Sequence, residues 1–368
     1  MKKAKRTVKS KAQLLMELSS KKSGGLRISA CWIVKNEQKN LPRSMMSVKD
    51  HVDEMIVVDT GSTDETIKIA ENFGAKVFNL AWDDDFSAPR NHALEQATGN
   101  WIVFLDADEY FDEDNAVNLR PAIGLTIEQK MTAMLINLVN IDADDNNKVI
   151  DSTYLCRIFK KVEGIHYVGR IHEELRLKDG KPLTKTIIVP GDVLTIKHTG
   201  YSMTVNREKA QRNLNMLLRE LETTGEPERI YVYLAQCYNG IDDYENAERY
   251  ARLDIGGGRK ASTFASSSHR ILIKILSSAD VDRLDERLEE AERAVEEFPA
   301  LPEFRAELAE CLAAKGEYAR AVVEMQKAIR NFKSYRGMEP MIFDRGMADF
   351  AVDRIKQWSE KQQVGGHC

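Results

Sequence analysis

Two carboxylates separated by one residue, Asp106 and Asp108, directly follow an uninterrupted run of apolar residues. A short apolar run of this kind is typical of a buried strand, so both carboxylates are expected where that strand ends. Carboxylate oxygens are hard ligands that suit Mg²⁺ or Mn²⁺, and they also accept hydrogen bonds from a ribose. An Asp-x-Asp pair is common, so its meaning depends on the elements that position it.

Polar residues follow three other apolar runs in the same way. They are Lys35-Asn36-Glu37, Asp59-Thr60-Gly61-Ser62 and Asp83-Asp84-Asp85. The carboxyl ends of parallel strands meet at one edge of a sheet, and open α/β sheets bind their ligands there. We therefore expect these polar residues to converge at one edge.

The elements that position them alternate along the first half of the chain. Strands are predicted over residues 28–34, 54–58, 76–80 and 101–105, and helices over residues 39–50, 64–73 and 88–97. Short strands rich in Val and Ile, separated by helices, predict βαβ units. The expected fold class is α/β, with a mostly parallel sheet covered by helices on both faces.

Beyond about residue 200, long amphipathic helical patterns replace the β-branched runs. Leu234 and Tyr244 recur in kind as Leu308 and Tyr318, an offset of 74 residues. This offset is close to two periods of the tetratricopeptide repeat, which has about 34 residues. An intervening copy fits the apolar positions Leu288, Ala291 and Ala294. The sequence thus predicts an all-α domain of two to three tetratricopeptide-like helix pairs.

The composition is that of a globular protein and argues against a membrane protein or a disulfide-rich protein. Of 368 residues, 43% are hydrophobic and 30% are charged, as in ordinary globular proteins. No apolar run approaches the roughly 20 residues that a membrane span requires. The five cysteines are scattered and include no Cys-x-x-Cys pair, so neither a disulfide framework nor a zinc site is expected. This use of cysteine favours a cytoplasmic location.

Charge is distributed unevenly along the chain. The net charge is −5, yet residues 1–27 carry nine basic side chains and one acidic one, a net +8 that leaves −13 for the rest. Residues 1–26 are predicted to be a flexible basic leader with at most peripheral membrane contact. The acidity elsewhere argues against nucleic-acid binding. The predicted α/β domain spans residues 27–200, the helical repeats 201–360 and a flexible tail 361–368.

Several spaced motifs resemble those of the family 2 glycosyltransferases and occur in that family's order. They are Ile33-Val-Lys-Asn-Glu37, Ile56-Val-Val-Asp-Thr-Gly-Ser-Thr-Asp64, Asp85-Phe-Ser-Ala-Pro-Arg-Asn91, Gly99-Asn-Trp-Ile-Val-Phe-Leu-Asp-Ala-Asp108, Gly169-Arg-Ile-His-Glu-Glu174 and His198-Thr-Gly-Tyr201. The resemblance implies a GT-A nucleotide-sugar fold. Together with the repeats, it points to a bacterial branch that includes peptide S-glycosyltransferases of bacteriocins.

The resemblance implies binding roles for individual residues. Asp59 matches the family's uracil-binding Asp, which makes a UDP-sugar the expected donor. Asp108 is the expected ligand of Mg²⁺ or Mn²⁺, His198 completes its shell, and Asp106 holds the metal or the ribose. Ser62 either lines the donor pocket or caps the next helix. Further donor-binding roles are implied for Asn36, Glu37, Arg90 and Arg157.

Inverting transfer, which the family implies, needs a general base to take the acceptor's proton. Glu173 is the first candidate, and His172 is the second, as the base or as the residue that orients it. The choice between them stays open at the level of sequence.

The sequence therefore predicts a metal-dependent inverting enzyme that moves a hexose from a UDP-sugar to an acceptor. Repeat surfaces commonly bind polypeptide, which favours a peptide or protein acceptor modified on Cys or Ser/Thr. Two alternatives remain open: a cell-envelope saccharide or lipid-linked acceptor, and a non-catalytic repeat scaffold with a vestigial transferase domain. A homodimer formed through the helices is also compatible with the sequence.

Overall fold

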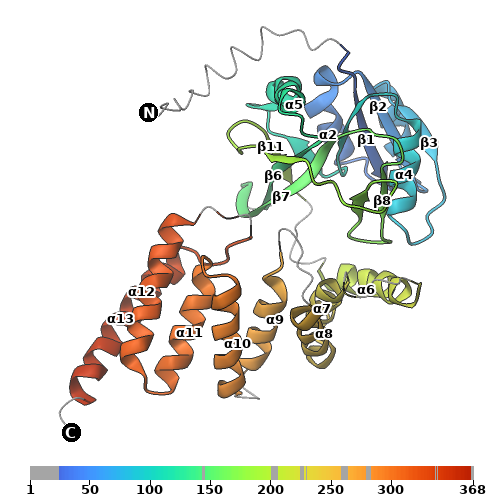
Figure 1. Cartoon of the computed structure of the whole chain (residues 1–368). Helices are drawn as coiled ribbons and strands as arrows, with labels where there is room; N and C mark the ends of the chain where they lie inside the picture. The colour runs from blue at the N-terminus through green and yellow to red at the C-terminus, as the bar shows by residue number, and fades with distance from the viewer. Residues whose placement is uncertain are drawn as a thin grey trace, which may run out of the picture. The chain divides into compact units, whose positions relative to one another are not determined.

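The computed structural model divides into two compact units, one before and one after the boundary between residues 205 and 206 (Figure 1). It describes residues 25–142, 146–199, 206–223, 228, 230–257, 264–278, 283–335, 337 and 339–365. The leader predicted for residues 1–26 lies outside this set except for its last two residues, and so do Tyr201 and Cys368. None of the described helices is both long and apolar enough to cross a membrane.

The first unit is built on four parallel strands. They are β1 (Ile28–Val34), β2 (Glu54–Asp59), β3 (Lys76–Asn79) and β4 (Trp101–Phe104). Their order in the sheet is β3-β2-β1-β4, and each neighbouring pair is parallel. Each strand agrees with its predicted range to within one residue at either end. All four therefore direct their carboxyl ends to the same edge.

Three helices connect these strands and cover both faces of the sheet (Figure 1). They are α2 (Leu41–Val48), which continues as the 3₁₀ turn η1 (Lys49–His51), α3 (Thr66–Asn72) and α4 (Ser87–Gln96). Leu41 and Met45 of α2 pack in one core cluster with Trp32 of β1, whereas Ala93 of α4 packs in another with Cys31. Because alternate residues of β1 point to opposite faces, the strand is buried on both sides.

The remaining strands add antiparallel pairings, so the sheet is mixed while most of its strand pairs stay parallel, as the sequence predicted. They are β5 (Glu109–Phe111), β6 (Ala133–Asp142), β7 (Lys148–Lys160), β10 (Thr186–Ile188) and β11 (Thr195–His198), with η2 (Ala116–Asn118) and α5 (Leu119–Glu128) between β5 and β6. The sheet continues from β4 in the order β7-β6-β11-β5. β7 is antiparallel to both β4 and β6. Its pairing with β6 is the one expected of two strands joined by a short connection.

A separate two-stranded antiparallel sheet, β8 (His166–Val168) and β9 (Glu174–Arg176), follows β7. It is fixed to α4 by reciprocal bonds: the Asn91 side chain donates to the Tyr167 carbonyl (2.9 Å) and accepts from the Tyr167 N–H (2.7 Å). Ser87 also donates its hydroxyl hydrogen to the Gly169 carbonyl (2.6 Å). The segment that leads to β9 is thereby held against the amino-terminal half of α4.

All the regular elements described in the second unit are helices. They are α6 (Asn206–Thr223), α7 (Tyr231–Gly240), α8 (Tyr244–Gly257), α9 (Ser267–Leu276), α10 (Leu284–Glu297), α11 (Pro302–Ala314), α12 (Tyr318–Ser334) and α13 (Arg345–Gly365). Tyr244 and Tyr318, predicted equivalents, begin α8 and α12. Ala291 and Ala294 of the intervening copy are fully buried in α10. α13 continues beyond residue 360, where the sequence predicted a tail.

Ion pairs join equivalent positions of successive helix pairs. Arg283, which precedes α10, binds Glu248 of α8 (2.7 Å), and Arg252 of α8 binds Glu286 of α10 (2.8 Å). The partners are separated by 35 and 34 residues, which is the period of the tetratricopeptide repeat. These contacts therefore agree with the repeat prediction made from apolar residues alone.

Glu54 joins three segments at the sheet edge opposite the strand ends. Its carboxylate accepts hydrogen bonds from the Ser29 hydroxyl (2.5 Å) and the Thr98 N–H (2.5 Å), and it pairs with Lys76 (3.1 Å). Burial alone would raise the pKa of Glu54, but these bonds outweigh it and lower the pKa to about 2. The ionised carboxylate therefore stabilises the start of the sheet.

We expect Glu54→Gln to remove part of the acid dependence of folding. A carboxylate with a lowered pKa contributes stability above its unfolded pKa and loses it as the pH falls through the folded pKa. For Glu54 that window runs from 4.5 down to about 2, and it corresponds to about 3 kcal/mol. Urea unfolding of both proteins across this window measures the difference. The exposed Glu65→Gln is the control, and equal slopes for wild type and Glu54→Gln would contradict the assignment.

Candidate active site

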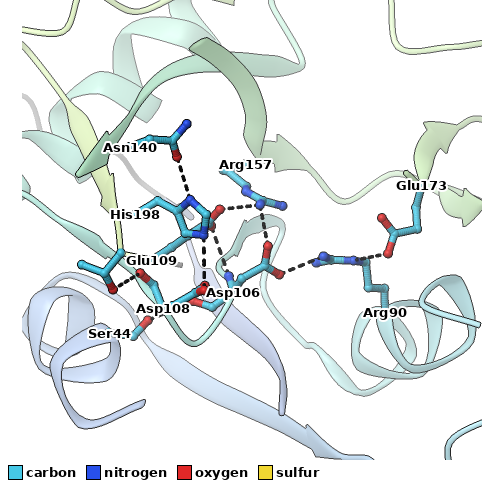
Figure 2. Close-up of polar contacts among 10 residues, drawn as sticks. Ser44, Arg90, Asp106, Asp108, Glu109, Asn140, Arg157, Glu173 and His198 are labelled. Atoms are coloured by element: carbon cyan, nitrogen blue, oxygen red, sulfur yellow. Dashed lines mark hydrogen bonds and ion pairs between the residues drawn. The ribbon is translucent and has the colours of Figure 1, made fainter. Parts of the chain in front are cut away.

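Asp106 and Asp108 lie in the loop between β4 and β5, where the sequence placed them. Two arginines hold the Asp106 carboxylate: Arg90 Nη2 donates to Oδ1 (2.8 Å) and Arg157 Nη2 donates to Oδ2 (2.6 Å) (Figure 2). Burial alone would raise the pKa of Asp106, but the charges of Arg157 and Arg90 lower it well below its usual range. Asp106 is therefore an ionised carboxylate with a fixed orientation.

The same arginines extend these contacts to two further carboxylates. Arg90 Nε donates to Glu173 Oε1 (3.1 Å), and Arg157 Nη2 donates to Glu109 Oε1 (2.5 Å). The five side chains alternate in the sign of their charge (Figure 2). We call them the ion-pair chain, in the order Glu173, Arg90, Asp106, Arg157 and Glu109. Removing one member of such a buried set leaves its neighbour's charge uncompensated.

Each arginine comes from an element packed against β4. Arg90, on α4, is 5% exposed, and its guanidinium lies 4.8 Å from the Phe104 ring centroid and 5.6 Å from that of Tyr167. Burial alone would lower the pKa of Arg90, but Asp106 and Glu173 raise it. Arg157 lies on β7, the antiparallel neighbour of β4. The packing of α4 and the pairing of β7 with β4 therefore place both guanidinium groups next to the Asp-x-Asp motif.

Asp108 forms a second pair, with His198 at the end of β11. His198 Nε2 lies 3.2 Å from Asp108 Oδ2, and its Nδ1 lies 2.7 Å from Asn140 Oδ1 (Figure 2). Burial alone would lower the pKa of His198, but Asp108 raises it. The Asp108 and His198 side chains are 27% and 20% exposed, so both are partly accessible to solvent.

The predicted metal ligands fall into two groups in this structure. Asp108 and His198 lie together, whereas the Asp106 carboxylate faces the arginines. Within the described part of the chain, no three His, Cys, Asp or Glu side chains are arranged to hold a metal ion. An accessible carboxylate–imidazole pair nevertheless fits Mg²⁺ or Mn²⁺, because such ions often take only one or two protein ligands and complete their shell with substrate phosphates and water.

The last residue of β2, Asp59, has a buried carboxylate with one oxygen that has no partner among the described residues. Asp59 is 3% exposed, and its Oδ2 accepts from the Gly61 and Ser62 N–H groups, each at 2.9 Å. Gly61 has φ 111°, a conformation that favours glycine. Oδ1 is buried and has no hydrogen-bond partner among the described residues. A buried acceptor without a donor is unfavourable, so Oδ1 is suited to an N–H group of a ligand.

The loops after β1 and β2 bind each other. The Asn36 N–H donates to Ser62 Oγ (2.9 Å), and Asn36 Oδ1 accepts from the Thr63 N–H (2.8 Å). Ser62 therefore joins the two loops and does not cap α3; Asp64 instead accepts from the N–H of Thr66, the first residue of α3 (3.0 Å). These bonds fix the position of Asp59 relative to the end of β1.

Glu37 lies in the loop after β1, and the charges of the Asp-x-Asp motif shift its pKa. It is half-buried, and its carboxylate accepts from the Asn40 side-chain amide (2.9 Å). Burial raises the pKa of Glu37, and the negative charges of Asp108 and Asp106 raise it further. The polar residues after β1 and β4 therefore converge, as the strand directions predict.

The two candidates for the base occupy different settings. Glu173 belongs to the ion-pair chain, and its side chain is 12% exposed. His172 precedes it with φ 54°, a left-handed conformation that is uncommon outside glycine. The structure thus brings Glu173, the first candidate, to the Asp-x-Asp motif through Arg90.

Three residues at the site were not identified from the sequence. Glu109 orients Arg157, Asn140 contacts His198, and Arg43 donates from Nη2 to Thr199 Oγ1 (2.9 Å) while stacking on Tyr110. The sequence does contain a feature that could have identified Glu109, since this residue ends the acidic run after β4. Asn140 and Arg43 have no such feature, because they lie within a strand and a helix that only tertiary pairing brings to the site.

Comparison with known proteins identifies the class. Residues 29–123 match the model of glycosyl transferase family 2. The chain therefore carries a family 2 glycosyltransferase domain with a GT-A-like mixed sheet, followed by a helical region. The predicted resemblance is confirmed for this domain, and the predicted fold class is confirmed as well.

Curated relatives share this combination over part of their length. A TPR repeat-containing protein of Synechococcus elongatus is 32% identical over 242 residues, which are 63% of this chain and 57% of that protein. The SPbeta prophage-derived glycosyltransferase SunS of Bacillus subtilis is 28% identical over 237 residues, 62% of this chain and 53% of SunS. The matched part of the chain spans just over half the length of these relatives.

A solved structure resembles part of the chain. Glucosyl-3-phosphoglycerate synthase from Mycobacterium tuberculosis, in complex with Mn²⁺ and UDP-glucose, matches with a TM-score of 0.27 and 20% sequence identity. The match covers 38% of this chain and 50% of that one.

Proposed function

We propose that this protein is a metal-dependent inverting glycosyltransferase that moves a hexose from a UDP-sugar to a peptide or protein acceptor. The observation that carries the proposal is the meeting of three groups at one edge of the sheet: the unpartnered Asp59 oxygen, the Asp108–His198 pair and the Glu173 carboxylate. They supply, respectively, a base-recognition group, a metal site and a proton acceptor.

Recognition of uridine is assigned to the loops after β1 and β2. Asp59 Oδ1 would accept a hydrogen bond from the imide N–H of uracil, which satisfies the Asp59 oxygen that has no partner among the described residues. Asn36 and Glu37 would line the same pocket, and Asp106, oriented by Arg90 and Arg157, would accept a hydrogen bond from the ribose.

We expect Asp59→Asn to weaken UDP binding about 10- to 100-fold, because the amide can place an N–H against the uracil N–H and leave a buried donor unpaired. Isothermal titration with UDP measures the loss. The exposed Asp50→Asn serves as the control for a neutralised carboxylate. Unchanged UDP affinity in Asp59→Asn would contradict the assignment.

The metal would be held by Asp108 Oδ2 and His198 Nε2, with diphosphate oxygens and water as its remaining ligands. When bound, a divalent cation neutralises charge that develops on the departing diphosphate. The Thr199 N–H and hydroxyl both donate to the Asp108 carbonyl (3.2 and 3.3 Å) and so fix the loop that presents Asp108.

Glu173 is proposed as the general base. Arg90 engages its Oε1, and Oε2 would take the proton of the acceptor hydroxyl as the acceptor oxygen bonds to the anomeric carbon and the bond from that carbon to the UDP oxygen breaks. A cysteine acceptor would depend less on this group, because a thiol loses its proton more readily than a hydroxyl.

A peptide or protein acceptor is supported by the helical repeats, since stacked helix pairs present extended surfaces that commonly bind polypeptide. The site favours an active enzyme over a vestigial domain, because the residues with proposed roles are all present at positions that suit those roles. They are Asp59, Asp108, His198 and Glu173. We place the reaction in the bacterial cytoplasm, where UDP-sugars would be available to it.

Thermal-shift measurements with UDP, GDP and dTDP, each with and without Mn²⁺, test the proposal. Ligand at 100 times its Kd stabilises the folded state by about 2.7 kcal/mol. We expect the largest rise in Tm for UDP with Mn²⁺ and a smaller one for GDP or dTDP. No rise with any nucleotide and metal pair would overturn the proposed function.

A further inference from the structure

The His198 ring is held from its two sides by groups on different elements. β11 pairs in parallel with β6, and this register places Asn140 directly opposite His198. Asn140 is 5% exposed and contributes Oδ1 at 2.7 Å from His198 Nδ1, while Asp108 contributes Oδ2 at 3.2 Å from Nε2 (Figure 2). Strand pairing, rather than a mobile loop, therefore sets the contact between Asn140 and the ring.

This contact favours a proton on the ring nitrogen that faces Asn140, whereas the Asp108 carboxylate, also an acceptor, competes for the proton at the other nitrogen. An amide oxygen can only accept a hydrogen bond, so the contact with Asn140 Oδ1 is satisfied when the nitrogen that faces it is an N–H. In neutral imidazole only one nitrogen is protonated, and the lone pair then lies on the other one. For His198 that other nitrogen is Nε2, which faces Asp108.

We propose that Asn140 is a positioning residue that fixes His198 in the tautomer whose Nε2 lone pair is directed, beside Asp108, at a divalent cation. The inference rests on the proposed function and adds a residue to it that no sequence motif indicates. Outer hydrogen-bond partners of ligating histidines act in this way in other metal sites, and their loss typically weakens metal affinity by about 10- to 100-fold.

Three variants of the full-length chain test the role of Asn140. Asn140→Ala removes the acceptor oxygen, Asn140→Asp keeps one, and Asn137→Ala changes the same residue type on the same strand but on the opposite face of the sheet. Free Mn²⁺, followed by electron paramagnetic resonance during titration in saturating UDP, gives the metal affinity. UDP affinity without metal and the unfolding midpoint report on the fold.

We expect Asn140→Ala to weaken Mn²⁺ binding about 10- to 100-fold, with UDP affinity unchanged. Asn140→Asp and Asn137→Ala should stay close to wild type. A merely structural role would instead lower the unfolding midpoint and affect the binding of UDP and Mn²⁺ together.

A second readout needs no metal. In protein labelled with ¹⁵N-histidine, the ring nitrogens of His198, recognised as the signals lost in His198→Gln, should show the Nδ1–H tautomer in wild type under alkaline conditions. Asn140→Ala should show a mixture of the two tautomers. This measurement separates orientation of the ring from any indirect effect on activity.

The outcomes distinguish the two levels of the proposal. If wild type binds Mn²⁺ with UDP, and Asn140→Ala binds it equally well with the same tautomer, the role of Asn140 is wrong and the proposed function stands. If wild type binds no Mn²⁺ in the presence of UDP, both the metal site and the role of Asn140 are wrong.

Discussion

Replacing Asp108 with Asn should lower sugar transfer by about a thousandfold, the size of effect seen when a group that stabilises developing charge is lost. The reason lies in the geometry: Asp108 and His198 are 3.2 Å apart, and Asp106 is already held by Arg90 and Arg157. No other described carboxylate faces His198 at hydrogen-bonding distance. Initial rates of UDP release from a UDP-hexose at saturating Mn²⁺ measure the effect.

Asp114→Asn is the matched control for Asp108→Asn, because Asp114 is an exposed aspartate that follows β5 a few residues later. We expect it to leave the rate unchanged. Asp108→Asn should also lose the Mn²⁺-dependent part of UDP binding while it keeps the metal-independent part. A variant that retained wild-type rates would show that Asp108 does not hold the metal.

Replacing Glu173 with Gln should lower transfer to a hydroxyl acceptor by about 10²- to 10⁴-fold, the usual contribution of a general base. The amide keeps the shape of the side chain but cannot take the proton, and the charge partner of Arg90 is lost. Nucleotide and metal affinity should change little, because Asp59, Asp108 and His198 are untouched. Single-turnover rates at saturating donor separate the chemical step from binding.

Glu174→Gln is the control for Glu173→Gln, since Glu174 is the adjacent residue of the same type and pairs with Arg176 instead of Arg90. The comparison also reports on the acceptor. Near-normal turnover of Glu173→Gln with a serine or threonine peptide would contradict its role as the base. A mild effect with a cysteine peptide alone would indicate that a thiol is the natural nucleophile.

The elements around the site could be predicted because their signals are local. The segments that became β1 to β4 are short and mostly apolar, and polar residues follow each of them, so period and composition defined them to within one residue. The antiparallel position of β7 between β4 and β6 could not be predicted in this way. Its pairing depends on contacts between segments that are far apart in the sequence.

The difference between local signals and contacts across the chain also explains which features of the site could be predicted. Spacing alone grouped Asp106 with Asp108 as neighbouring ligands, yet the structure directs the first carboxylate to Arg90 and Arg157 and the second to His198. Arg157 reaches Asp106 only because β7 inserts beside β4. The apolar run before Asp106 located both carboxylates after β4, but the partners that decide their roles come from other elements.

The most direct test of the central claim is whether the protein turns over UDP-sugars with a divalent metal. Incubation with a panel of UDP-, GDP- and dTDP-hexoses, with and without Mn²⁺, should release UDP from at least one UDP-hexose only when the metal is present, and Asp108→Asn should abolish this release. Release that is independent of metal, equal for the three nucleotides or unchanged in Asp108→Asn would contradict a metal-dependent glycosyltransferase at this edge of the sheet.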